Sequence, residues 1–126
     1  MLLCGCGQLE ACGTASDLRA IAGQRGVDLR PRGCAARDHT RVVTCRADID
    51  PAALALLRDK LALEPLASAH APGPAFGRSR CLDEARSGAS AWVTSFPWIA
   101  RSHYRYLLIV VDVDGSVCIE TEHGYG

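Results

Sequence analysis

The sequence has no long hydrophobic run and no net charge. Its most apolar strand-like run, Leu107 to Val111, spans five residues, whereas a helix that crosses a bilayer needs roughly 18. Lysine plus arginine total 14 and aspartate plus glutamate total 14, so no overall field attracts the chain to nucleic acid or to a membrane surface. We therefore expect no membrane partner.

A secretory signal is also missing from the pattern. Met1 to Gly5 contains no basic segment followed by a hydrophobic stretch, the arrangement typical of a signal peptide. The seven cysteines are an odd number, and without a signal they disfavour a complete disulfide framework. We expect reduced thiols and a cytoplasmic location.

Aromatic residues are scarce, at 6% of the chain. Residues 19–46 hold seven arginines but no aromatic side chain on which a base could stack, as single-stranded nucleic acid binding requires. Nucleic-acid contact is therefore a weakly supported hypothesis. The length of 126 residues fits one domain, 1–126. Its Cys- and Gly-rich segment at 1–13 predicts irregular backbone.

Hydrophobic periodicity predicts helices and strands in alternation. The clearest element is a helix at 51–63, because Asp50 is a good N-cap, Pro51 suits the first helical position and Leu57 belongs to an apolar stripe. Proline and glycine predict a flexible loop over 65–79. The remaining predictions are a helix at 15–25 capped by Thr14, a loop at 27–39, a strand from Thr40 to Ile49, a short helix at 80–87 capped by Ser79, and strands at 91–94, 104–111 and 116–122.

Together these elements predict an α+β fold: a small two-layer domain with an antiparallel sheet, two or three helices mainly on one face, and a C-terminal β-hairpin. Asp114-Gly115 indicates a two-residue type I′ turn. That turn would pair Val110 with Ile119, and it would leave a half-apolar, half-acidic face that contains Ile109 and Val111. Either another element covers the apolar part of this face or a partner does.

Partner binding is indicated by Trp92 and Trp98, two of the few aromatic residues, which lie within seven residues of the chain in a turn-containing segment. Tryptophan is a frequent anchor at protein interfaces, although it also packs in cores. With Ile109 and Val111 these residues form the predicted partner-binding set. The partner would be another protein or a second copy of this chain.

Metal binding is suggested by Cys4-Gly5-Cys6 and Cys12. Thiolates are the soft ligands that Zn²⁺ prefers, and Gly5 allows the backbone to turn around an ion. The segment resembles a short zinc knuckle of the SEC-C type, which would imply zinc held by Cys4, Cys6 and Cys12 with a fourth ligand from elsewhere. Free or buried cysteines are the alternative interpretation.

The segment that ends in Asp112-Val113-Asp114-Gly115 resembles motif I of the haloacid dehalogenase superfamily. The resemblance implies Asp112 as the nucleophile and Asp114 as the acid/base. We prefer the hairpin interpretation, because that fold needs a helix and three further motifs after this strand, and only nine residues follow Val117.

A group of polar residues surrounds the predicted hairpin, and an acidic edge strand that resists edge-to-edge pairing explains it best. A metal or acid/base site is the alternative. The group comprises His103, Asp112, Asp114, Glu120, Glu122 and His123.

The leading hypothesis is a small non-enzymatic binding protein, such as an inhibitor or accessory protein, with no cofactor. The alternatives are a zinc-stabilised module that touches nucleic acid and a small metal- or His-dependent hydrolase.

Overall fold

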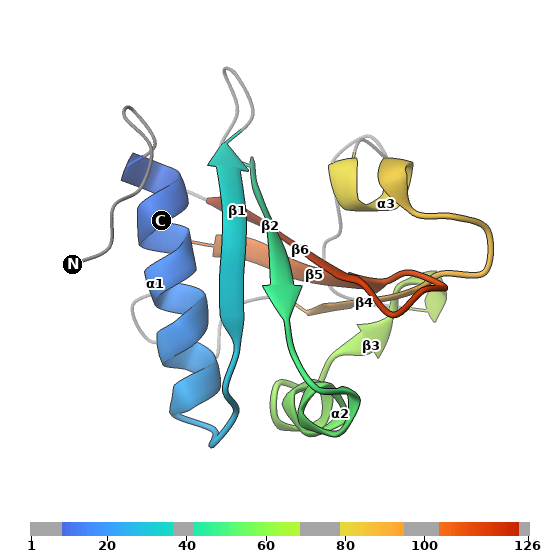
Figure 1. The fold of residues 1–126 in the computed structure, drawn as a ribbon, viewed down its shortest axis with the longest axis horizontal. Coiled ribbons are helices and arrows are strands. Elements are labelled where there is room, and N and C mark those ends of the chain that lie inside the picture. The colour runs from blue at the N-terminus through green and yellow to red at the C-terminus, as the bar shows by residue number, and fades with distance from the viewer. Residues whose placement is uncertain (1–8, 37–41, 69–78, 95–103, 124–126) are drawn as a thin grey trace.

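The computed structural model describes residues 9–36, 42–68, 79–94 and 104–123. Within these residues, six strands form one antiparallel sheet in the order β1-β2-β6-β5-β4-β3, with three α-helices around it (Figure 1). The predicted α+β fold is confirmed. In chain order the elements are α1 (Leu9–Gly23), β1 (Arg30–Ala36), β2 (Val42–Asp48), α2 (Pro51–Lys60), β3 (Glu64–Pro65), the 3₁₀ helix η1 (Leu66–Ser68), α3 (Arg80–Glu84), β4 (Ser90–Thr94), β5 (Tyr104–Val111) and β6 (Val117–His123).

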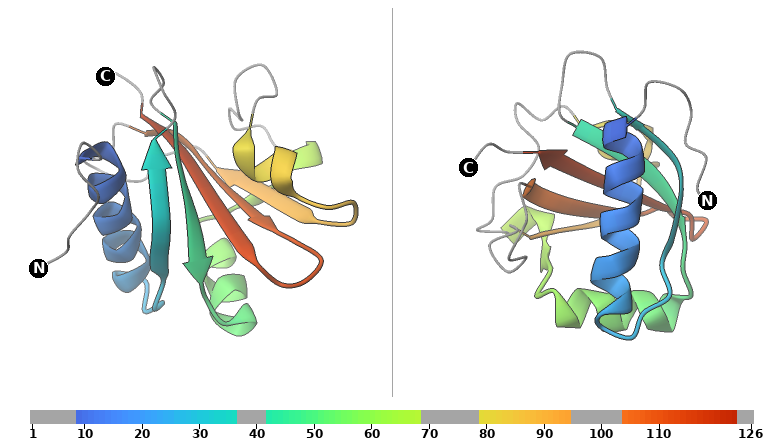
Figure 2. Two further views of the ribbon diagram at one scale, coloured as in Figure 1. Left: turned by 45° about the horizontal axis from the view of Figure 1, so that its top comes forward. Right: turned by 90° about the vertical axis from the view of Figure 1, so that its left-hand side faces the viewer.

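The two faces of the sheet carry different helices. Helices α1 and α2 cover one face, and the short α3 lies over the other (Figure 2). Side chains alternate between the two faces along a strand, so the register assigns each residue to one face of the sheet. Ile109, opposite Ile119, packs with α1 and α2, whereas Leu108, opposite Glu120, faces α3.

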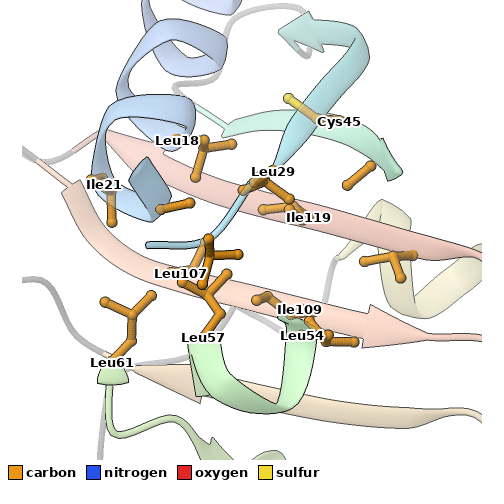
Figure 3. Close-up of a cluster of buried hydrophobic side chains, with 14 of the residues drawn as sticks. Leu18, Ile21, Leu29, Cys45, Leu54, Leu57, Leu61, Leu107, Ile109 and Ile119 are labelled. Carbon is orange, nitrogen blue, oxygen red and sulfur yellow. The ribbon is translucent and has the colours of Figure 1, made fainter. Parts of the chain in front are cut away.

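The larger core lies between the sheet and helices α1 and α2 (Figure 3). Helix α2 begins as predicted, since the Asp50 side chain accepts hydrogen bonds from the amides of Ala52 and Ala53 and Pro51 follows it. Its apolar stripe is buried against the sheet. The stripe comprises Leu54, Leu57 and Leu61.

Helix α1 begins at Leu9 rather than at residue 15, so the predicted irregular backbone is wrong for residues 9–13. Thr14 is buried inside the helix and is not its N-cap. Local glycine and cysteine content suggested a loop, but the helical face that contains Leu18 and Ile21 packs on the sheet and favours helix despite Gly13. Gly26 has the positive φ expected after the helix, at 74°.

Strand β1 was predicted to be a loop because it contains Pro31 and Gly33. Both residues fit an edge strand, where proline need not donate a backbone hydrogen bond and where a bulge can accommodate glycine. The register shifts between Arg32 and Ala35, and Gly33 there has a φ of 60°. Strand β2 is confirmed, and its buried face includes Cys45.

The hairpin is confirmed, but its turn and register are not those predicted. The Asp112 carbonyl accepts from the Gly115 amide, and the Asp112 amide donates to the Ser116 carbonyl. Only Gly115 has a positive φ, of 89°, among the turn residues, which is typical of a type I turn followed by a glycine bulge. Val110 therefore pairs with Cys118 rather than Ile119, a one-residue shift that exchanges the faces.

The part of the predicted 65–79 loop that the structure describes forms β3 and η1; residues 69–78 lie outside the described chain. Strand β4 is confirmed. Helix α3 is confirmed with its predicted Ser79 cap, although it ends at Glu84.

Leu57→Ala should lower the free energy of unfolding by about 2–5 kcal/mol, because the substitution removes buried methyl groups and leaves a cavity. Leu57 is 1% exposed, whereas Leu56 beside it is 41% exposed. Leu56→Ala is thus the matched control, with an expected change within about 0.5 kcal/mol. Urea unfolding measures both. Equal losses in the two variants would show that α2 packs by a different face.

Candidate functional site

Glu120 is the most deeply buried acidic group of the described chain, with 0% exposure. Its Oε1 accepts from the Ser79 hydroxyl at 2.9 Å and from the Cys81 amide at 3.4 Å, and its Oε2 accepts from the Tyr106 hydroxyl at 2.8 Å. The expected acidic edge strand is therefore wrong. Strand β6 lies between β2 and β5, and Glu120 points toward α3.

Glu120 fixes the start of α3. A helix of five residues is too short to be stable on its own. Ser79 donates to Glu120 and accepts from the Leu82 amide at 3.2 Å, so one hydroxyl joins the helix cap to the sheet. The disulfide between Cys81 and Cys118 adds a covalent link from α3 to β6.

A polar cleft of about 140 Å³ lies between α3 and strands β1 and β2. Arg46 of β2 and Arg80 of α3 both contact Glu84: Arg46 Nη2 is 2.6 Å from Oε2, and Arg80 Nε is 2.9 Å from Oε1. We define this cleft by its lining residues: Gly33, Ala35, Thr44, Cys45, Arg46, Arg80 and Glu84.

Thr44 lies on the cleft side of the sheet, since it pairs with Ala35 on one side and with Glu120 on the other. The residue is 7% exposed, and its hydroxyl oxygen has no hydrogen-bond partner. A buried hydroxyl without a partner costs about 1–3 kcal/mol, so Thr44 has an unused hydrogen-bonding group at the floor of the cleft.

Each wall of the cleft is cross-linked by a disulfide. Cys34 and Cys45 join the edge strand β1 to β2, and Cys81 and Cys118 join α3 to β6. The expectation of reduced thiols is therefore wrong for these four cysteines. The odd count of seven cysteines gave no sign of these pairs, because only the fold brings their members together.

The sequence pointed to none of the cleft residues as a site. Arg46 belonged to the arginine-rich segment, and strand alternation placed Thr44 and Arg46 on one face. Nothing local placed Arg80 and Glu84 opposite them, because Arg46 and Arg80 are 34 positions apart in the sequence. The sheet register and the disulfide between Cys81 and Cys118 bring them together.

The two aspartates of the dehalogenase-like motif lie in the hairpin turn beside Arg86. Arg86 Nη2 is 2.7 Å from Asp114 Oδ2, and Arg86 Nε lies 3.5 Å from Asp112. Hydrogen bonds from the Ser116 hydroxyl and amide to Asp114 are the main cause of its lowered pKa, with help from Arg86. Both aspartates thus stabilise the turn.

The other described polar residues of the predicted group, Glu120 and Glu122, do not join these aspartates. Glu122 is 3.6 Å from Arg105 across the sheet. His103 lies outside the described residues, as does the side chain of His123. Among the described members of the group, the structure therefore brings only Asp112 and Asp114 close together, and their common partner is Arg86.

Of the predicted zinc ligands, Cys4 and Cys6 lie outside the described residues, and Cys12 is disulfide-bonded. A disulfide sulfur is not the thiolate that zinc binds. Among the residues that the structure describes, no group of three or more His, Cys, Asp or Glu side chains is arranged to hold a metal ion.

The predicted partner-binding residues that the structure describes pack within the domain. Ile109 is 0% exposed in the core, so helices of the domain cover its face, which is the first of the two alternatives that the sequence left open. Val111 is partly buried against the same core. Trp92 lies under the Arg58 guanidinium of α2, 4.3 Å from the ring centre, and Trp98 lies outside the described residues.

Comparisons of the chain with protein-family models, with curated proteins and with solved structures found no match. The described helices include none that is both long and apolar enough to cross a membrane.

Replacing Cys81 and Cys118 together by alanine should lower the free energy of unfolding by about 2–4 kcal/mol, since the bond closes a loop of 37 residues in the unfolded chain. Thermal unfolding of the oxidised wild type and of the double variant measures the difference. Equal stability of the two proteins would mean that the bond does not constrain the chain.

Tyr104 should make stability depend on alkaline pH. Burial is the main cause of its raised pKa, followed by its hydrogen bond to Asp17. The protonated phenol is favoured in the fold, so its contribution is complete below the ordinary pKa of about 10 and is lost as pH rises above that value. The free energy of unfolding of Tyr104→Phe should therefore fall less than that of the wild type between about pH 9 and pH 11, roughly one unit either side of 10. Urea unfolding at the two pH values measures both losses. Identical losses would contradict the account.

Proposed function

We propose that this protein is a small non-enzymatic binding protein that works in an oxidising compartment, with the cleft between α3 and β1–β2 as its binding site. The observation that carries the proposal is the pair of disulfides, one in each wall of the cleft. A site whose walls are held before the ligand arrives loses less conformational entropy on binding.

The location is part of the proposal. Disulfides form and persist in oxidising environments and are rare in the cytosol. Cys81 and Cys118 are 1% and 4% exposed, so the disulfide occupies a place in the core where two reduced thiols would otherwise pack. Such a buried cross-link favours a chain that folds where thiols are oxidised.

A binding role is favoured over catalysis by how the candidate acids are used. Glu120 accepts three hydrogen bonds, and the two from Ser79 and Cys81 hold the start of α3 on the sheet. Asp112 and Asp114 pair with Arg86 in the turn. These groups have structural partners, whereas the cleft offers arginine guanidinium groups and a threonine hydroxyl, which are groups that recognise a ligand.

The test uses the oxidised full chain, with free thiols counted and bound metal measured on the same sample. Its melting temperature is recorded with a panel of small acids, amines, neutral polar compounds and blocked peptides. A ligand that binds only the folded state raises stability by about 2.7 kcal/mol at 100 times its Kd. The same sample is assayed with ester, phosphoester and peptide substrates.

We expect a saturable rise in melting temperature with at least one class of compound, and no turnover. Turnover of any substrate that tracks the purified protein would contradict the non-enzymatic part of the proposal. A panel without any saturable rise would contradict the binding site, and a full set of free thiols would contradict the oxidising compartment.

A further inference from the structure

The charges of the cleft favour a ligand with one negative charge. Two guanidinium groups, of Arg46 and Arg80, face the one carboxyl group of Glu84, so these groups leave a net formal charge of +1. A phosphate group carries about −1.5 to −2 at neutral pH and would leave excess negative charge beside Glu84. A carboxylate carries −1 and balances the cleft.

The arginines retain donors for such a group. Arg46 uses Nη2 and Arg80 uses Nε for the oxygens of Glu84. Each guanidinium group has five N–H donors in a planar fork whose spacing matches a carboxylate. Both side chains are about half exposed, at 44% and 54%, so their remaining donors are accessible from the cleft. Glu84 itself demonstrates that a carboxyl group fits between them.

The floor of the cleft adds a neutral donor. The Thr44 hydroxyl is buried on the same side of the sheet and has no partner. A ligand oxygen that reaches the floor would accept a hydrogen bond from it and remove the penalty of the unpartnered group. The space of about 140 Å³ is below the 300–1,000 Å³ usual for a whole small-molecule site, so the cleft fits one functional group with a short stem.

We propose that the cleft binds a carboxylate through Arg46, Arg80 and the Thr44 hydroxyl. This inference rests on the proposed binding function and specifies the chemistry of the ligand. The same carboxylate can belong to a small free acid or to an acidic side chain of a partner protein. In either case Glu84 competes with the ligand for the two arginines, so it weakens binding.

The experiment is calorimetric titration of the oxidised full chain at low salt. Three probes are used: acetate, the blocked tripeptide acetyl-Ala-Asp-Ala-amide and inorganic phosphate. The Asn-containing version of the tripeptide is the matched uncharged control. Binding of acetate alone assigns the site to small acids, and binding of the Asp peptide well above acetate assigns it to acidic side chains. Both results support the proposal.

Three variants test the named residues. Arg80→Gln and Thr44→Val should each weaken carboxylate binding, Arg80→Gln by about tenfold or more because a hydrogen bond to a charged group is lost. Glu84→Gln should tighten binding, because it removes the competing negative charge. Arg30→Gln removes an exposed arginine outside the cleft that pairs with Asp28 and should leave binding unchanged.

Stability separates ligand contact from structural damage. Thr44→Val removes a hydroxyl that has no partner in the free protein, so its melting temperature should equal or exceed that of the wild type while binding weakens. Weaker binding in Glu84→Gln would overturn the proposal, as would phosphate or the Asn peptide binding as tightly as the carboxylates. A compound from the wider panel that binds equally well to all four variants would overturn this inference and leave the proposed binding function standing.

Discussion

The carboxyl group of Glu120 lies in the middle of the sheet without access to solvent, and it accepts hydrogen bonds from Ser79, Cys81 and Tyr106. A buried polar atom without a partner costs about 1–3 kcal/mol, so each of these donors must stay where the fold places it. Two of the three belong to the start of α3. The position of that helix is therefore a condition for burying Glu120, and Glu120 is a condition for forming the helix.

The cleft is a consequence of this arrangement. Helix α3 covers only part of its face of the sheet, and the disulfide between Cys81 and Cys118 ties it to β6. Arg80 and Glu84 are thereby held across from Arg46. Strand β1, an edge strand with a bulge at Gly33, is held to β2 by the bond between Cys34 and Cys45. Polar groups on two cross-linked walls are suited to recognition, because the cleft loses little conformational entropy when a ligand binds.

The sequence predicted the elements whose signals are local. The Asp50-Pro51 cap, the leucine stripe of α2, the alternation in β2 and the apolar run of β5 each determine a structure within one segment. The α+β class followed from their order. Strand β1 escaped prediction because Pro31 and Gly33 disfavour strands except at an edge, and edge position is a property of the whole sheet.

The site was less predictable because it depends on the hairpin register. A two-residue turn and a turn with a glycine bulge differ by one residue of register, and that residue decides which face carries Glu120. The predicted turn placed Glu120 on an exposed acidic strand, whereas the bulge at Gly115 directs it into the α3 side of the sheet. The disulfides were equally hidden, because cysteine pairing follows the fold rather than the spacing.

The most direct measurement of the central claim is native-state hydrogen exchange of the amides of Cys81, Leu82 and Asp83. Their partners are Glu120, the Ser79 hydroxyl and the Ser79 carbonyl. If Glu120 and the disulfide hold α3 on the sheet, these amides exchange slowly in the oxidised protein and open together with β6. Exchange at the rate of an unstructured peptide, while β5 and β6 remain protected, would contradict the account.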